Sequence, residues 1–195
     1  QIMGLIRWTM EYIDEESFTY LYKSLVRPHL EYAVSVWNPY LKKLQTSIEN
    51  VQRRATKLVP TLKHLNYTSR LNKVKLPTLL YRRYRGDMIK VFKIVNSKYD
   101  NDVIVDFLPM MNTNARGNSL EIKKSHSRKE LRRNYFTQRI VDQWSLLLEY
   151  VVKSKSLNSF KSSLDRIWLD TSVMYDPDIE IKKLTSLGHD SLRLK

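Results

Sequence analysis

Along most of the chain, apolar residues recur at intervals of three and four, the spacing that places them on one face of an α-helix. Asp14 precedes two glutamates, which is typical of a helix N-terminus, so a helix is predicted at about 15–26. Pro28 breaks or kinks the path, and a short second helix is predicted to end at Trp37, before an Asn-Pro pair. The expected apolar faces of these two helices contain Phe18, Leu21, Tyr22, Leu25, Leu30, Tyr32, Ala33, Val36 and Trp37.

Three further helices are predicted in the next sixty residues, at about 44–59, 68–74 and 77–97. The first has an apolar stripe of Leu44, Ile48, Val51, Ala55 and Leu58, with Gln52, Arg53, Arg54 and Lys57 largely off it. The last has a stripe of Leu80, Tyr84, Met88, Val91 and Val95, with Arg82, Arg83, Lys90 and Lys93 on the far side. Both long helices therefore have one apolar face and one cationic face.

Asp87 projects near the apolar stripe of the helix predicted at 77–97. A carboxylate in an apolar environment is costly unless it is paired. We therefore expect a partner for Asp87, either a basic side chain or a helix N-terminus.

The second half of the chain begins with residues 99–118, whose Asn and Asp content with Gly117 predicts a linker or long loop. Weak alternation from Ser119 to Ser125 is compatible with a short β-hairpin near 118–127. A helix at about 128–149 is predicted to bury Leu131, Tyr135, Ile140, Trp144 and Leu147 and to turn Arg128, Lys129, Arg132, Arg133 and Arg139 outward. A last helix is predicted at 156–169.

These elements predict an all-α fold, with a multi-helix bundle and a smaller C-terminal helical lobe. The predicted divisions are a basic helical region at 1–98, a linker at 99–118, a helical extension at 119–170 and a tail at 171–195.

The composition favours an intracellular protein, nuclear or cytoplasmic and not secreted. Cysteine is absent, which excludes disulfides, thiolate zinc sites and a cysteine nucleophile. No apolar run reaches the roughly 20 residues that cross a bilayer, and we expect no membrane partner. The first methionine is Met3, which favours a fragment of a longer protein.

The formal net charge of +14 is concentrated in two blocks. Residues 40–98 contain fifteen Lys and Arg against Glu49 and Asp87, and residues 116–139 contain eight against Glu121 and Glu130. Such surfaces bind nucleic acid or acidic membranes through counterion release, although a basic helical face can also be merely solvated.

No catalytic or cofactor site is predicted within the chain. The four glycines are scattered, so there is no phosphate-binding loop, and the four histidines lack the spacing of metal ligands. The carboxylate pairs Asp100 with Asp102 and Asp176 with Asp178 have polar, turn-like neighbours and are interpreted as solvated loop acids rather than Mg²⁺ ligands. We expect no metal and no enzymatic activity from this chain alone.

The function that the sequence still favours is nucleic-acid binding, because Lys and Arg interleaved with aromatic residues can neutralise phosphates and stack on bases. The candidate contacts are Arg53, Arg54, Lys57, Arg82, Arg83, Lys90, Arg132 and Arg133. For the aromatic residues Trp37, Trp144, Phe160 and Trp168, packing in a core is the favoured interpretation.

Six segments in order resemble the region that follows the catalytic palm in reverse transcriptases of non-LTR retrotransposons of the jockey and chicken-repeat type. They are YKSLVRPHLEYAVSVWNPY at 22–40, NVQRRATKLVP at 50–60, LPTLLYRRYRGDMIKVFKIVN at 76–96, ARGNSLEIKK at 115–124, RRNYFTQRIVDQW at 132–144 and SLNSFKSSLDRIW at 156–168.

This resemblance implies that the first helices form a thumb, which grips template and primer, and that the later helices form a basic C-terminal extension. It implies RNA, an RNA–DNA hybrid or DNA as partner, together with the palm and fingers of the intact polymerase. Mg²⁺ is implied only for that palm, since no two aspartates are adjacent in this sequence, as they are in the metal-binding motif of the polymerase. Alternatives are a host-retained remnant that acts as a helical protein-interaction module, a relic with no selected function, or an autonomous nuclease or polymerase.

Overall fold

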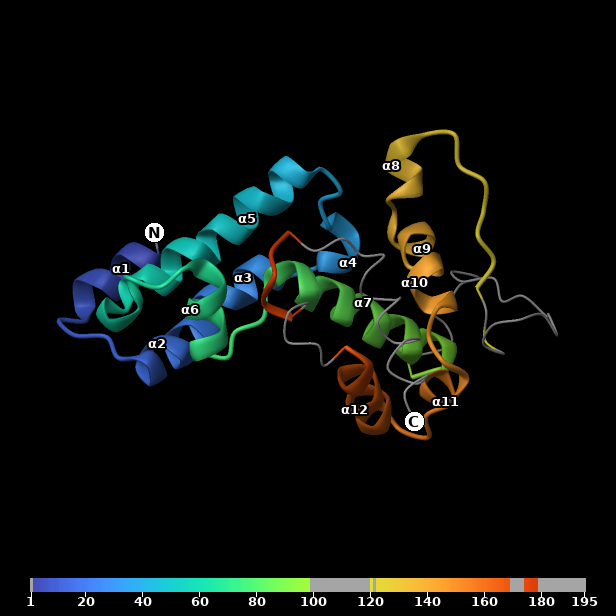
Figure 1. Ribbon diagram of the computed structural model, residues 1–195. Helices are drawn as coiled ribbons and strands as arrows, with labels where there is room; N and C mark the ends of the chain where they lie inside the picture. Colours follow the sequence, from blue (N-terminus) through green and yellow to red (C-terminus); the bar gives the residue numbers. More distant parts are fainter. Residues whose placement is uncertain (1, 99–119, 121, 169–173, 179–195) are drawn as a thin grey trace. The chain divides into compact units, whose positions relative to one another are not determined.

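The computed structural model describes residues 2–98, 120, 122–168 and 174–178, and this part of the chain is helical (Figure 1). The predicted all-α fold is confirmed. Within the described part of 118–127 there is no strand, only an isolated bridge residue at Ile122. The predicted linker at 99–118, with Asp100 and Asp102, lies outside the described residues.

The chain divides into two compact units, and the division falls inside one helix, between Arg83 and Tyr84. Unit 1 contains residues 1–83 and Met174–Asp178, and unit 2 contains Tyr84–Val173 and Ile179–Lys195. The predicted divisions at 98 and 118 stay predictions, because the intervening residues are not described.

Unit 1 is built from short and medium helices joined by tight connections (Figure 1). These are α1 (Ile2–Thr9), α2 (Glu15–Leu21), the π-helical turn η1 (Tyr22–Val26), α3 (Arg27–Glu31), α4 (Val34–Trp37), α5 (Lys42–Ala55), the 3₁₀ turns η2 (Thr56–Leu58) and η3 (Pro60–Leu62), α6 (Tyr67–Lys73) and the start of α7 (Leu79–Val95). The sequence pattern predicted most of these elements but not α1.

Local sequence explains where several helices begin. The Asp14 carboxylate accepts a hydrogen bond from the Ser17 backbone N–H at 2.8 Å, which confirms the predicted cap of α2. Asn66 caps α6 in the same way. Pro28 lies in the first turn of α3, where a backbone N–H has no partner within the helix. Its missing N–H therefore costs no helical hydrogen bond, and α3 directly follows the π-helical turn.

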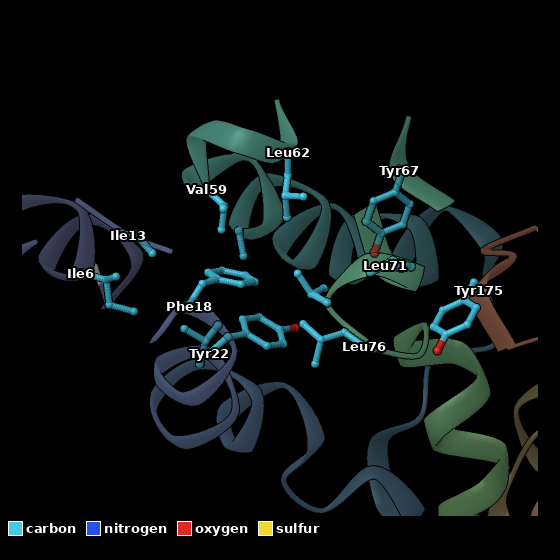
Figure 2. Packing of buried hydrophobic residues seen from close by; sticks show 13 residues of the cluster. Ile6, Ile13, Phe18, Tyr22, Val59, Leu62, Tyr67, Leu71, Leu76 and Tyr175 are labelled. Atoms are coloured by element: carbon cyan, nitrogen blue, oxygen red, sulfur yellow. The ribbon is translucent and has the colours of Figure 1, made fainter. Parts of the chain in front are cut away.

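Unit 1 has one apolar core, to which widely separated segments contribute (Figure 2). The stacked rings of Phe18 and Tyr22, with centroids 5.7 Å apart, pack with Val59, Leu62 and other residues of the 55–76 segment. Ile6 of α1 and Tyr175 of the C-terminal segment belong to the same cluster.

The predicted apolar face at 30–37 is confirmed only at Leu30, which packs against the core, and is wrong beyond it. Tyr32 is 79% exposed and Val36 is 74% exposed, and Trp37, expected in the core, is 39% exposed. Ala33 adopts a left-handed conformation that separates α3 from α4, so the two parts do not share one helical face. Helical spacing predicts a common face only while the helix is continuous.

Unit 2 contains the rest of α7, α8 (Glu130–Arg133), α9 (Phe136–Arg139), α10 (Val141–Ser145), α11 (Glu149–Val152) and α12 (Leu157–Ile167). The single helix predicted at 128–149 is therefore divided. Tyr135 and Leu148 are extended, and each interrupts the helical path. As a result Leu131 and Tyr135 are exposed, contrary to expectation, whereas Ile140, Trp144 and Leu147 are buried as predicted.

The core of unit 2 is rich in aromatic rings. Phe92 stacks on Phe160 with ring centroids 4.2 Å apart, and Trp144 packs beside Phe160 at 6.2 Å. The indole N–H of Trp144 donates to the Leu120 carbonyl at 2.7 Å, so this buried polar group is satisfied. Core packing was the favoured interpretation for Trp144, Phe160 and Trp168, and it is confirmed for these three.

Candidate nucleic-acid interface

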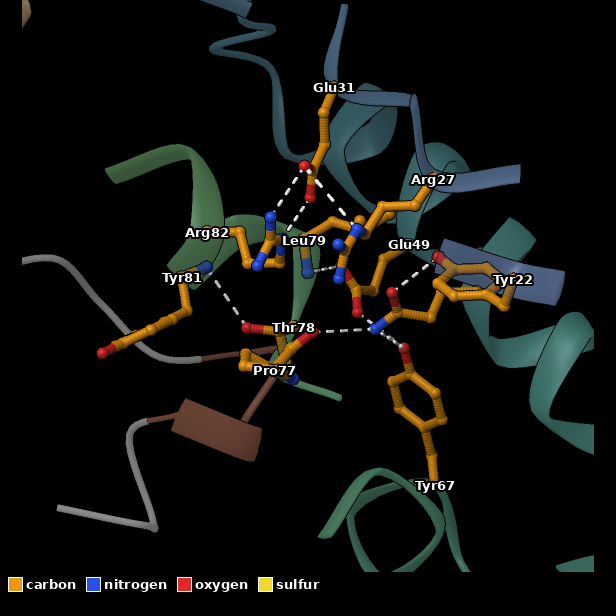
Figure 3. A network of polar contacts seen from close by, with 11 residues as sticks. Tyr22, Arg27, Glu31, Glu49, Tyr67, Pro77, Thr78, Leu79, Tyr81 and Arg82 are labelled. Carbon is orange, nitrogen blue, oxygen red and sulfur yellow. Dashed lines mark hydrogen bonds and ion pairs between the residues drawn. The ribbon is translucent and has the colours of Figure 1, made fainter. Parts of the chain in front are cut away.

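Two of the eight predicted phosphate contacts are engaged within unit 1. The guanidinium of Arg82 pairs with the Glu31 carboxylate through two hydrogen bonds, one of them 2.8 Å long (Figure 3). Arg83 is only 3% exposed and lies 5.7 Å from the Trp37 ring centroid. Their side chains therefore contribute to the fold, and charge reversal at either position would test stability before it tested binding.

Three other candidates lie beside aromatic rings. Arg53 is half-buried over the Tyr67 ring at 4.8 Å, Lys90 lies 5.6 Å from Phe136, and Arg132 lies 5.4 Å from Tyr135. A cation over a ring face is attracted by its quadrupole. Arg132 is exposed and can reach a phosphate, whereas Arg53 is held partly inside unit 1.

The remaining candidates in unit 1, Arg54 and Lys57, line a hollow of about 630 Å³. Its wall is formed by α1, the loop after α1, the end of α5 and the turns η2 and η3. The lining residues are Met3, Gly4, Arg7, Met10, Glu11, Ile13, Arg54, Lys57, Leu58, Pro60 and Lys63.

The lining of this hollow is strongly cationic. Arg7, Arg54, Lys57 and Lys63 are all exposed, and Glu11 is the only acid among the lining residues. Within the described residues none of these five forms an ion pair, and Arg54 makes only a long backbone contact, from Nε to the Asn50 carbonyl at 3.3 Å. The four cations are therefore available to an anionic ligand, and we call this feature the cationic hollow.

A second, smaller hollow lies in unit 2 and includes the candidate Arg133. Its volume is about 360 Å³, and it is lined by Lys124, Ser125, His126, Ser127, Arg133 and Gln138. Lys124 also pairs with Asp142, at 2.6 Å, which offsets part of the positive charge. The larger cationic hollow is accordingly the better candidate for binding.

Sequence reasoning missed Arg7 and Lys63 as members of the site. Arg7 belongs to α1, which was not predicted, and Lys63 follows a short 3₁₀ turn with no helical periodicity. Their signal in the sequence was only their charge. They join Arg54 and Lys57 because the core residues Ile6, Ile13, Val59 and Leu62 bring α1 against the turns after α5.

Glu49 belongs to a buried polar cluster of unit 1 (Figure 3). The residue is 6% exposed, and its carboxylate accepts hydrogen bonds from the Tyr67 hydroxyl at 2.6 Å and from the Leu79 N–H at 3.0 Å. Gln52 accepts from Tyr22 at 2.6 Å and donates to the Pro77 carbonyl at 3.0 Å. Both side chains of α5 thus join α6 and the start of α7, which is a structural role.

Burial raises the pKa of Glu49, although Tyr67, Leu79 and Arg83 oppose this shift. A raised folded pKa means that folding favours the protonated form. This contribution to stability is complete below the ordinary value of 4.5 and is lost as the pH rises through the folded pKa.

The quantity to compare is the difference between the free energies of unfolding of the wild type and of Glu49→Gln. We predict that this difference falls as the pH rises above about 4.5. The slope can reach about 1.4 kcal/mol per pH unit. Urea unfolding of both proteins from pH 4 to pH 8 measures it, and the subtraction removes the common contribution of other carboxylates. A difference that stayed constant or rose with pH would contradict the assignment.

The other acids do not form a metal centre in the described part of the chain. No group of three or more potential ligands is found among those residues. The Asp176 carboxylate accepts a hydrogen bond from the backbone N–H of Asp178 at 2.9 Å, so these two residues form a local turn. Among the described helices, none has the length and apolarity needed to span a membrane.

Arg139, expected to point outward, instead points inward. It is paired with Asp87 through Nε at 3.0 Å and Nη2 at 3.1 Å, and the two side chains are 12% and 3% exposed. This confirms the expected partner for Asp87 and removes Arg139 from the solvated cations.

Comparison with known proteins adds no relative. No family model matches the chain, and no curated protein or solved structure matches it significantly.

Proposed function

We propose that this chain is a nucleic-acid-binding C-terminal part of a non-LTR retrotransposon reverse transcriptase and holds template and primer by phosphate contacts. The observation that supports the binding role is the cationic hollow, whose lining has four exposed cations and one acid. The ordered resemblance of six segments supports the family, and the helical fold is compatible with it. In this proposal catalysis belongs to a palm outside these 195 residues.

The phosphate-binding surface proposed for unit 1 consists of Arg7, Arg54, Lys57 and Lys63. Arg132 and Arg133 supply exposed cations in unit 2. Phosphate neutralisation releases counterions, so the logarithm of the binding constant should fall linearly with the logarithm of the salt concentration. On duplex DNA each phosphate contact contributes about −0.9 to the slope. Because these contacts lie on the backbone, sequence preference should be slight.

Charge reversal in the cationic hollow tests this proposal. The variant Arg54→Glu, Lys57→Glu, Lys63→Glu is expected to bind a labelled 20-nucleotide RNA–DNA hybrid at least about tenfold more weakly. Its salt slope should be smaller by about 2 to 3, since up to three contacts are lost. Fluorescence anisotropy from 50 to 300 mM salt measures both quantities, with circular dichroism to check folding.

A matched control changes the net charge equally at exposed sites outside the hollow. Lys23→Glu, Lys155→Glu, Arg166→Glu also replaces three cations with three acids, and Arg166, like Arg54, lies in the last turn of a helix. We expect this control to lose much less affinity. Equal losses in both variants, or an affinity independent of salt in the wild type, would refute the proposed surface.

A second candidate function is protein interaction, favoured by the many exposed apolar side chains in the first 44 residues of unit 1. The most exposed of them are Leu5, Trp8, Tyr12, Tyr20, Tyr32 and Val36. Clustered exposed apolar surface commonly marks an interface. An upstream reading frame that encodes the palm aspartates would favour the polymerase, and its absence would favour a retained interaction module.

A further inference from the structure

The cationic hollow combines two kinds of surface that a duplex backbone does not require together. Its cations, Arg7, Arg54, Lys57 and Lys63, are exposed, whereas Ile13 is buried and Met3 and Leu58 are partly buried. The lining of the hollow therefore combines exposed cations with apolar side chains. Phosphates alone would be served by a flat basic surface, since they carry no apolar group.

The volume of the hollow and the chemistry of its lining suit a flat aromatic ligand. A volume of about 630 Å³ lies within the range of about 300–1,000 Å³ that is usual for small-ligand pockets. Met3 and Met10 both line the hollow, and methionine sulfur makes favourable contacts with aromatic rings. A nucleobase has such a ring and is linked to a phosphate that the surrounding cations can neutralise.

We infer that the cationic hollow admits an unstacked base of a single strand, so that unit 1 binds single-stranded nucleic acid in preference to a duplex. The inference rests on the proposed nucleic-acid binding and specifies its substrate. In a duplex the bases are paired and stacked, and a base would have to leave the helix to enter the hollow. In a single strand the base is already accessible, and binding is tolerant of sequence because every base has a π-face.

Gly4 permits a test in which the charges are unchanged. It lines the hollow, and a Cβ built on it meets no atom within 4 Å. Gly4 also lies within α1, where leucine is a better helix former than glycine, so Gly4→Leu should not unfold the helix. The leucine side chain would occupy part of the space that a base requires.

Anisotropy at one salt concentration should compare a labelled 20-nucleotide single strand with the same strand annealed to its complement. The wild type is expected to bind the single strand at least about fivefold more tightly, and Gly4→Leu is expected to weaken that binding by about fivefold or more. Binding of the duplex should change less than about twofold. Gly86→Leu is the matched control, because Gly86 lies in α7 outside the hollow and a Cβ built on it also meets no atom within 4 Å; it should leave both affinities nearly unchanged.

Three results would overturn the inference. They are a wild type that binds the duplex as tightly as the single strand, a Gly4→Leu variant that weakens both ligands alike, and one that weakens neither. The triple charge reversal at Arg54, Lys57 and Lys63 separates the two proposals. If the triple charge reversal weakens binding while Gly4→Leu does not, the proposed function stands and the base site is wrong. If neither variant weakens binding, both proposals are wrong.

Discussion

Replacing Asp87 with alanine is expected to destabilise unit 2 by about 3–5 kcal/mol. Asp87 and Arg139 form a buried pair with two hydrogen bonds, and both side chains are almost fully removed from water. The pair itself adds little net stability, because desolvation of two charges offsets much of their attraction. Loss of the carboxylate alone is costly, since the guanidinium stays buried and loses its two hydrogen bonds to Asp87.

Chemical unfolding, followed by tryptophan fluorescence, measures this change. Trp8 and Trp37 belong to unit 1, and their replacement by phenylalanine leaves Trp144 and Trp168 to report on unit 2. Asp165→Ala is the matched control, because Asp165 pairs with Arg85 in the same unit but is 43% exposed in its side chain. The control should cost no more than about 1 kcal/mol.

A double variant distinguishes the pair from simple loss of packing. Asp87→Leu with Arg139→Met removes both charges and retains apolar volume, so it should recover much of the stability lost in Asp87→Ala. If the double variant were as unstable as the sum of the two single variants, the coupling between the charges would be absent.

Replacing Glu49 with alanine is expected to destabilise unit 1 by about 3 kcal/mol or more. The substitution removes the acceptor of two buried donors, the Tyr67 hydroxyl and the Leu79 N–H, and each unsatisfied donor costs about 1–3 kcal/mol. Leu79 is the first residue of α7, so the carboxylate also stabilises the positive end of that helix.

Urea unfolding and amide hydrogen exchange together measure this effect, with faster exchange expected at Leu79. Glu15→Ala serves as control, because Glu15 pairs with Lys73 at 2.9 Å on the surface of the same unit. Its loss should cost no more than about 1 kcal/mol. Similar destabilisation by both substitutions would contradict the structural role of the buried cluster.

Periodicity and capping chemistry were sufficient to predict most of the helices, because both act within a few residues. Asp14 caps α2 through Ser17, three positions away, and the apolar residues of α12 repeat at helical spacing. Prediction failed where the helical path is interrupted. The left-handed Ala33 and the extended Tyr135 each end a helix whose apolar pattern continues in the sequence.

The same local signals could not identify which cations face solvent. Arg54 and Arg82 have similar neighbours in the sequence, since each stands next to another arginine on a predicted basic helix face. Arg82 is neutralised by Glu31, 51 residues away, whereas Arg54 lines a hollow whose other wall is α1. Gln52 was placed off the apolar stripe and is buried, because Tyr22 and Pro77 supply its hydrogen-bond partners.

The amino-acid sequence alone was enough to establish an all-helical chain, the position of its basic blocks and the need of Asp87 for a partner. Helical propensity, net charge and the cost of a buried carboxylate are local properties, and each can be evaluated from neighbouring residues. The identity of that partner and the assembly of the cationic hollow were decided by tertiary structure. Both depend on contacts between distant segments, and apolar burial brings those segments together without leaving a periodic signal in the sequence.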